Sequence, residues 1–284
     1  MFGSHLSIAG GMCNALTKAE ELGCESVQVF TKNQKQWSCS PLAADAVREW
    51  QAHCKRLKFK RTVSHDSYLI NLASPDEMLW RKSVECFIEE VSRCVTLGIP
   101  YLVTHPGAHM GAGEDEGITR IVAALDVVLA SIPGGGKGVT ICLEATAGQG
   151  SSVGHRLEHL AEIIERVKNP RRFGVCLDTA HLFAAGYDFR GRKYASLRKQ
   201  IDKTIGLSRV KVLHLNDSKK ELASRVDRHE HIGRGLIGVE GFKPWLRDEA
   251  FADVPKILET EKGTCPDTGK DWDAINLEVL RSLL

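Results

Sequence analysis

The sequence lacks the features that mark several common classes of protein. Its nine cysteines form no CxxC pair, its first residues show no basic start followed by a long apolar run, and no stretch of about 18 apolar residues occurs. We therefore expect reduced, mostly structural thiols, no signal peptide, no membrane-spanning segment and a cytoplasmic location.

A large excess of either charge is also missing. The 38 basic and 36 acidic residues leave a formal net charge of only +2. Proteins that bind nucleic acid through their overall charge are more basic than this, so any nucleic-acid surface must be local. The glycine-rich run at 133–137 (PGGGK) precedes a predicted strand and lacks the GK[ST] ending of a phosphate loop, so it predicts a turn.

What the sequence does contain is a regular alternation of short β-branched or apolar runs and longer segments of helical period. The clearest helices are expected at 14–22, 76–97, 117–131 and 157–167. Eight strands are expected at 3–8, 25–30, 61–65, 100–104, 139–144, 173–178, 210–215 and 255–260. Gly23 and Gly98 fall where helix C-caps belong.

This alternation indicates an α/β protein built as a single (β/α)8 TIM barrel, with one domain over residues 1–284. A doubly wound open sheet is the structural alternative. The strand count favours the barrel, whose active site would lie at the C-terminal ends of the strands.

Seven of the eight predicted strands end in, or exit into, a metal-competent or titratable side chain, and the second strand is the exception. These side chains are His5, His65 with Asp66, His105, Glu144, Asp178 with His181, His214 and Glu259. The loop after the seventh strand adds Asp227 and His229. Because strand ends of one barrel converge, we expect most of these groups to share one small space.

So many carboxylates cannot be ionised together without cations, because like charges raise each other's pKa. Imidazole and carboxylate ligands without cysteine suit zinc or manganese better than magnesium. Nine candidate ligands exceed what one tetrahedral zinc uses, so the site should hold several metals. Asp227 and His229 have the i,i+2 spacing of one side of an extended segment, and Asp178 and His181 the i,i+3 spacing of a first helical turn.

Along nearly all its length the sequence resembles endonuclease IV, a family of DNA-repair enzymes. The matching segments are FTKNQKQW (30–37), SHDSYLINLASP (64–75), THPGAH (104–109), LEATAGQGSSVG (143–154), LDTAHLFAAGYD (177–188), LHLNDSK (213–219), SRVDRHEHIGRGLIG (224–238) and ILET (257–260). They are long, unusual and in the family's order.

The resemblance implies three zinc ions per chain, with manganese acceptable at one position, and Glu144 as the bridging ligand. The three ligand sets would be His65, His105 and Glu144; Glu144, Asp178, His214 and Glu259; and His181, Asp227 and His229. It implies hydrolysis of the phosphodiester 5′ to an abasic site in double-stranded DNA, leaving a 3′-hydroxyl and a 5′-deoxyribose phosphate. We expect a monomer, located with the nucleoid if the cell is bacterial.

The resemblance also suggests residues that enter the DNA minor groove, which are Lys35, Tyr68 and Leu69. Lys35 departs from the arginine of the better-known members and loses planar stacking, so it fits a phosphate contact better than an inserting group. Further phosphate contacts are expected from Lys32, Arg225, Arg228 and Arg234.

Two other functions remain open. A metal-dependent sugar isomerase or epimerase uses the same barrel and similar ligands, although the set of nine ligands favours the nuclease. A non-catalytic DNA- or metal-binding module would have no need for a hydroxide-generating site. His5 and Asp66 could orient ligands or be merely structural. Residues 262–284 predict a loop and a closing helix without an assigned role.

Overall fold

The first and last strands of the barrel, β1 (Phe2–His5) and β12 (Lys256–Leu258), pair with each other and close a parallel barrel in the computed structural model, which describes residues 1–284. Around the barrel the strands follow the order β1-β12-β9-β8-β6-β4-β3-β2. The other six are β2 (Ser26–Phe30), β3 (Val63–His65), β4 (Tyr101–Thr104), β6 (Thr140–Glu144), β8 (Phe173–Asp178) and β9 (Val210–His214). The predicted TIM barrel is confirmed, because an open sheet would leave β1 and β12 unpaired.

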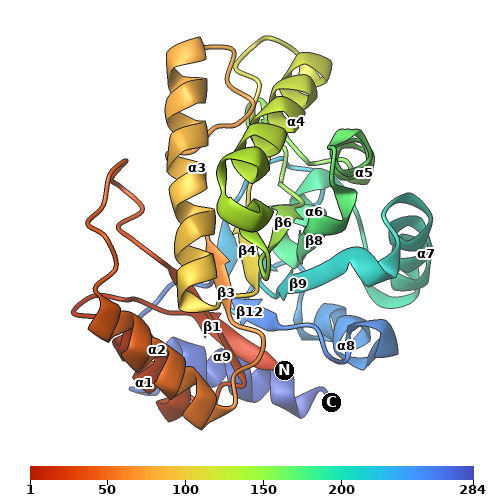
Figure 1. Cartoon of the computed structure of the whole chain (residues 1–284). Coiled ribbons are helices and arrows are strands. Elements are labelled where there is room, and N and C mark those ends of the chain that lie inside the picture. The colour runs from red at the N-terminus through yellow and green to blue at the C-terminus, as the bar shows by residue number, and fades with distance from the viewer.

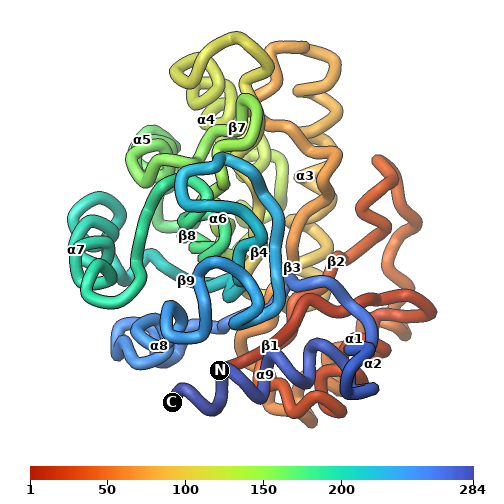
Figure 2. The backbone as a smooth tube through the Cα atoms, turned by 180° about the vertical axis from the view of Figure 1, so that it is seen from behind, coloured from red at the N-terminus to blue at the C-terminus, as the bar shows by residue number.

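Helices surround the strands (Figure 1). They are α1 (Met12–Glu21), α2 (Ala44–Leu57), α3 (Glu77–Leu97), α4 (Glu114–Ser131), α5 (Leu157–Arg166), α6 (Thr179–Ala185), α7 (Tyr194–Thr204), α8 (Val239–Arg247) and α9 (Trp272–Ser282). None of them combines the length and apolar character needed to span a bilayer. Both chain ends lie at the lower end of the molecule in Figures 1 and 2.

Local signals in the sequence explain where the helices begin and end. In α3 the side chain of Asp76 accepts the N–H of Leu79 at 2.8 Å, and Gly98 ends the helix with a φ of 74°. Helix α4 starts three residues before the predicted position 117, with acidic residues in its first turn, where they favour the helix dipole. The nine cysteines are all free thiols.

Two apolar layers hold the barrel. A cluster of 62 buried residues fills the space around and between the helices and the outer side of the strands. A separate cluster of six lies on the inner side of the strands: Val63, Val103, Cys142, Cys176, Val212 and Ile257. Burial of this apolar surface supplies the main driving force for folding.

Two small antiparallel ladders cover the C-terminal end of the barrel. One joins β5 (Gly107–Ala108) to β7 (Ser152–Val153), and the other joins β10 (Asp217–Ser218) to β11 (His229–Glu230). Figure 2 shows the light-blue chain after β9 lying in front of the strands. The second ladder brings residues 229–230 back toward the end of β9.

The buried carboxylate of Asp217 organises the loop that follows β11. One of its oxygens accepts the N–H groups of Ser218 and Ile237 at 2.8 and 2.9 Å. The other accepts those of Gly233, Gly235 and Gly238 at 2.9, 3.1 and 3.3 Å. A Cβ at position 235 would lie 2.5 Å from this carboxylate, so only glycine fits there.

We predict that Asp217→Ala lowers the free energy of unfolding by at least about 3 kcal/mol, because it leaves several backbone N–H groups without an acceptor. Chemical denaturation measures this value. Asp253→Ala removes an acid that is 87% exposed and should cost less than about 0.5 kcal/mol. Equal losses in the two variants would contradict the role given to Asp217.

Candidate metal centre

Side chains alternate between the two faces of a strand, and this period builds the site. Each strand, or the residue just after it, presents one polar side chain at the C-terminal end of the barrel. On six strands this side chain lies two residues after the residue of the inner apolar cluster, as His65 follows Val63. In strand order from β1 to β12 they are His5, Gln28, His65, His105, Glu144, Asp178, His214 and Glu259. We call these eight residues the polar ring.

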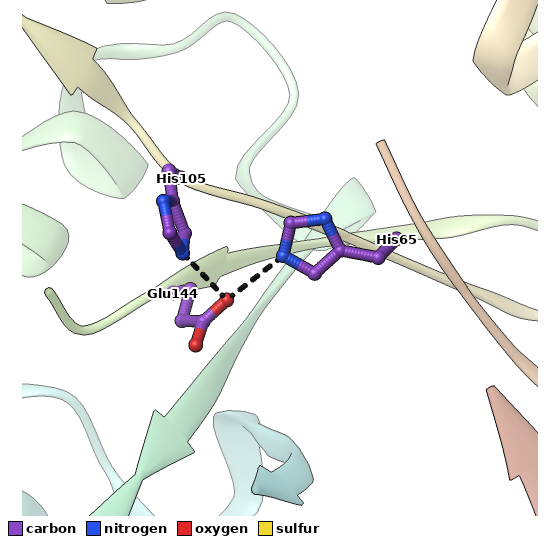
Figure 3. Close-up of side chains that lie close together, drawn as sticks. All are labelled: His65, His105 and Glu144. Atoms are coloured by element: carbon purple, nitrogen blue, oxygen red, sulfur yellow. Dashed lines mark hydrogen bonds and ion pairs between the residues drawn. The ribbon is translucent and has the colours of Figure 1, made fainter. Parts of the chain in front are cut away.

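Glu144 is the member of the polar ring that faces the most histidines, and it is fully buried. One carboxylate oxygen is 3.2 Å from His65 Nε2 and 3.3 Å from His105 Nε2 (Figure 3). The other is 3.1 Å from Nδ1 of both His181 and His214. Four histidines, from β3, α6, β9 and the residue after β4, therefore face one carboxylate.

The remaining predicted ligands continue from this centre. His214 Nδ1 is 3.0 Å from Glu259, and His229 Nε2 is 3.7 Å from Asp178. Asp227 is 3.1 Å from His181 Nε2 and 3.2 Å from His229 Nε2. All nine residues predicted from the sequence are thus brought together.

The donor atoms form three overlapping groups, in each of which they lie within 4.8 Å of one another. The groups are His65, His105 and Glu144; Glu144, Asp178, His214 and Glu259; and Asp178, His181 and His229, with Asp227 bonded to the last two. Oxygen and imidazole nitrogen donors in such groups fit zinc. Cys176 also approaches His214, but burial raises the pKa of its thiol to about 12, so it is neutral.

Backbone carbonyls hold three of the histidine rings in place. Nδ1 of His65 donates to the carbonyl of Asp66 at 2.9 Å, that of His181 to Ala145 at 3.0 Å, and that of His229 to Glu259 at 3.3 Å. With the proton held on Nδ1, Nε2 is the nitrogen free to bind a metal.

The charges of the centre compensate one another in the metal-free protein. Burial opposes the charged form of His65, but its hydrogen bond with Glu144 and nearby carboxylate charges raise its pKa to about 9. The pKa of His229 is likewise raised to about 9, against the effect of burial, by Asp178 and Asp227. In turn, although burial opposes it, the histidines hold the pKa of Glu144 and Glu259 well below the usual value.

Three further residues support the ligands. His5 Nδ1 lies 3.2 Å from Glu259, and Asp66 lies 3.4 Å from His65 Nδ1, so both occupy orienting positions. Asn216 was not predicted as a site residue. Its amide donates to Asp178 at 2.7 Å, and its carbonyl oxygen accepts the N–H of Glu259 at 2.8 Å.

A second histidine–carboxylate cluster joins Glu114, at the start of α4, to His155 and His159. The N–H of Gly154 donates to His159 Nδ1 at 3.2 Å, which leaves the ring proton on Nε2, 3.2 Å from Glu114. Burial lowers the pKa of His159 and favours this neutral form. The nitrogen that faces Glu114 therefore carries a proton, and the contact is a hydrogen bond between α4 and α5 rather than a metal site.

A cleft of about 750 Å³ opens beside the metal centre, and its lining includes Glu259, His229, Tyr68 and Lys35. Tyr68 is 67% exposed, Leu69 is half-buried, and Lys35 is exposed. Arg225, Arg228 and Arg234 are exposed as well.

Lys32, predicted to contact phosphate, belongs to the cleft lining but is largely buried there. Its side chain is only 2% exposed, and its Nζ is 3.0 Å from the carbonyl of Gln36, 3.2 Å from Cys86 Sγ and 3.6 Å from Glu90. The ammonium group is neutralised inside the protein and stabilises the loop after β2.

Comparison with known proteins agrees with this fold. Residues 16–283 match the family model described as xylose isomerase-like TIM barrel. The chain is 47% identical over 284 residues to "Probable endonuclease 4" of Chloroflexus aurantiacus, covering 100% of this chain and 98% of the relative. The crystal structure of endonuclease IV from Thermus thermophilus superposes with a TM-score of 0.86 at 36% identity, covering 99% of this chain and 98% of that one.

A D-tagatose 3-epimerase-like protein also superposes, with a TM-score of 0.72 over 99% of this chain and 96% of its own, but at 19% identity it shows the barrel fold alone. Fold and polar ring together define a xylose isomerase-like TIM barrel with a metal-competent centre. Within that class, the chain belongs to the endonuclease IV family.

We predict that the metal-free protein loses stability as pH rises from about 6.5 to about 9. His65 and His229 have raised pKa values of about 9 in the fold and about 6.5 when unfolded, so their contribution is complete below pH 6.5 and disappears as pH passes 9. Thermal unfolding in excess chelator measures this dependence.

Zinc-loaded protein should show the opposite trend between pH 5 and 7, because metal binding requires neutral imidazoles. Equal melting temperatures at pH 6.5 and pH 9 in chelator would show that protonated histidines do not compensate the carboxylates.

Proposed function

We propose that this protein is a zinc-dependent endonuclease that hydrolyses the phosphodiester 5′ to abasic sites in double-stranded DNA. The products would be a 3′-hydroxyl and a 5′-deoxyribose phosphate. Three zinc ions per chain would be held by nine ligands in three sets, with manganese acceptable at one position. The sets are His65, His105 and Glu144; Glu144, Asp178, His214 and Glu259; and His181, Asp227 and His229. The protein would act as a monomer in the cytoplasm.

The observation that carries this proposal is the convergence of nine nitrogen- and oxygen-donor side chains on the buried Glu144, in a chain of the endonuclease IV family. A single metal could not use all nine. The two oxygens of Glu144 face different histidine pairs, as a bridging ligand requires.

When bound, zinc supplies Lewis acidity, which lowers the pKa of water to about 7 and withdraws charge from phosphate oxygens. The side chains of this protein orient the ligands and limit access of solvent. Carbonyl-anchored histidines keep their donor nitrogens aimed at the centre, and the closed floor of apolar residues beneath the polar ring limits solvent to the cleft side.

The DNA would approach through the cleft. Tyr68 follows the ligand His65 by three residues and stands exposed at the cleft, where its ring packs 5.6 Å from Phe30. We assign Tyr68 and Leu69 to the wedge that fills the space of a flipped nucleotide, and Lys35, Arg225 and Arg228 to phosphate contacts.

Glu144→Gln should lower kcat/KM for incision of a duplex with one abasic analogue by at least about 100-fold and reduce the zinc content below three. The matched control is Glu114→Gln, which alters the carboxylate of the second histidine cluster and should leave both values near those of the unchanged protein. Incision activity and elemental analysis are measured on the same samples. Active protein with one metal or none would contradict the trinuclear centre.

The double change Tyr68→Ala, Leu69→Ala should leave the zinc content intact and strongly weaken cutting of a fully paired duplex. The double change should weaken cutting much less when the abasic site lies opposite a gap. Unstacking costs a few kcal/mol per step, and the gap removes much of that cost. Measuring kcat/KM on both substrates tests this.

Met78→Ala serves as control, since Met78 is 84% exposed but does not line the cleft. An equal loss on the two substrates would mean that the pair supports the loop or the metals instead of acting as a wedge.

A further inference from the structure

One member of the polar ring is neither a titratable group nor a strong metal ligand. It is Gln28 of strand β2, which is fully buried. The other members of the ring are all titratable. An amide has no charge to balance there, and its burial is costly unless both its donor and its acceptor are used.

Both ends of the Gln28 amide are used, and each contacts a predicted metal ligand or its neighbour. Its oxygen lies 2.8 Å from His214 Nε2. Its nitrogen donates to a carboxylate oxygen of Glu259 and lies 2.9 Å from His5 Nδ1.

These contacts allow only one orientation of the amide. Rotating it by 180° would bring its oxygen against the carboxylate oxygen of Glu259, and two acceptors would then face each other. The oxygen therefore faces His214, and that ring must carry its proton on Nε2 to donate to it.

His214 differs in this respect from its neighbours. His65, His181 and His229 keep the proton on Nδ1 through backbone carbonyls. His214 has no carbonyl in that position and turns Nδ1 toward Glu144 at 3.1 Å and Glu259 at 3.0 Å. If its proton moved to Nδ1, the lone pair would point away from the centre.

We propose that Gln28 is a positioning residue of the metal centre, which fixes the Nε2–H form of His214 through its oxygen and holds Glu259 through its nitrogen. This inference rests on the proposed metal-dependent function. Gln28 thereby orients two ligands of the same group through one uncharged side chain.

The test compares Gln28→Met with Ser26→Ala. Methionine has a similar length but neither donor nor strong acceptor. Ser26 lies on the same strand and the same face, is equally buried, and its hydroxyl donates to the carbonyl of Arg61 at 2.6 Å without touching a ligand. Zinc affinity is measured by competition with a chelator, and folding by thermal unfolding of the metal-free protein.

We expect Gln28→Met to weaken the affinity for zinc by about 10- to 100-fold, and Ser26→Ala to change it less than about threefold. A third variant, Gln28→Glu, separates the two contacts. It keeps an oxygen for His214 Nε2–H but replaces the donor to Glu259 by a like charge.

In zinc-loaded protein, the nuclear magnetic resonance signal of the His214 Nε2 proton should keep its hydrogen-bonded shift in Gln28→Glu and move upfield in Gln28→Met. An unmoved signal in Gln28→Met, or equal affinity losses in Gln28→Met and Ser26→Ala, would overturn this inference alone. Absence of zinc binding by the unchanged protein would instead overturn the proposed metal centre.

Discussion

A carboxylate without any exposed surface, Glu144, sits where eight strands converge, and the surrounding structure must supply it with positive charge. An uncompensated buried charge of this kind costs several kcal/mol. Histidines on β3, β9 and α6, and just beyond β4, meet this requirement by facing its two oxygens. In the metal-free state, protons on these histidines supply the positive charge. Bound metal ions would supply it in their place, so the same side chains would stabilise the fold and hold the metals.

The two-residue period of the strands separates this polar centre from the apolar interior of the barrel. Val63, Val103, Cys142, Cys176, Val212 and Ile257 form a layer of their own, one step below the polar ring. A substitution in the polar ring would therefore change the groups of the candidate metal centre without removing a side chain from the inner apolar layer.

The sequence predicted the barrel, its eight strands and the convergence of nine candidate ligands, because ionisable side chains at the ends of apolar runs are conspicuous. It did not reveal Gln28 or Asn216, since an amide carries no charge and only its partners, far along the chain, show its role. The burial of Lys32 was not foreseen for a related reason. Its neutralising partner Glu90 belongs to α3 and comes near only after that helix packs over the loop.

Because β1 pairs with β12, the barrel and its site can be complete only after β12 has been synthesised. Ser4 meets the backbone of Leu258 across a separation of 254 residues, and Glu259 comes from the strand that closes the barrel. While β12 is still inside the ribosome, the emerged part of the chain has an open sheet edge and an incomplete polar ring. Contacts so distant in sequence form late in folding, so a prematurely terminated product would hold most of the ligands yet lack the enclosure that makes them a site.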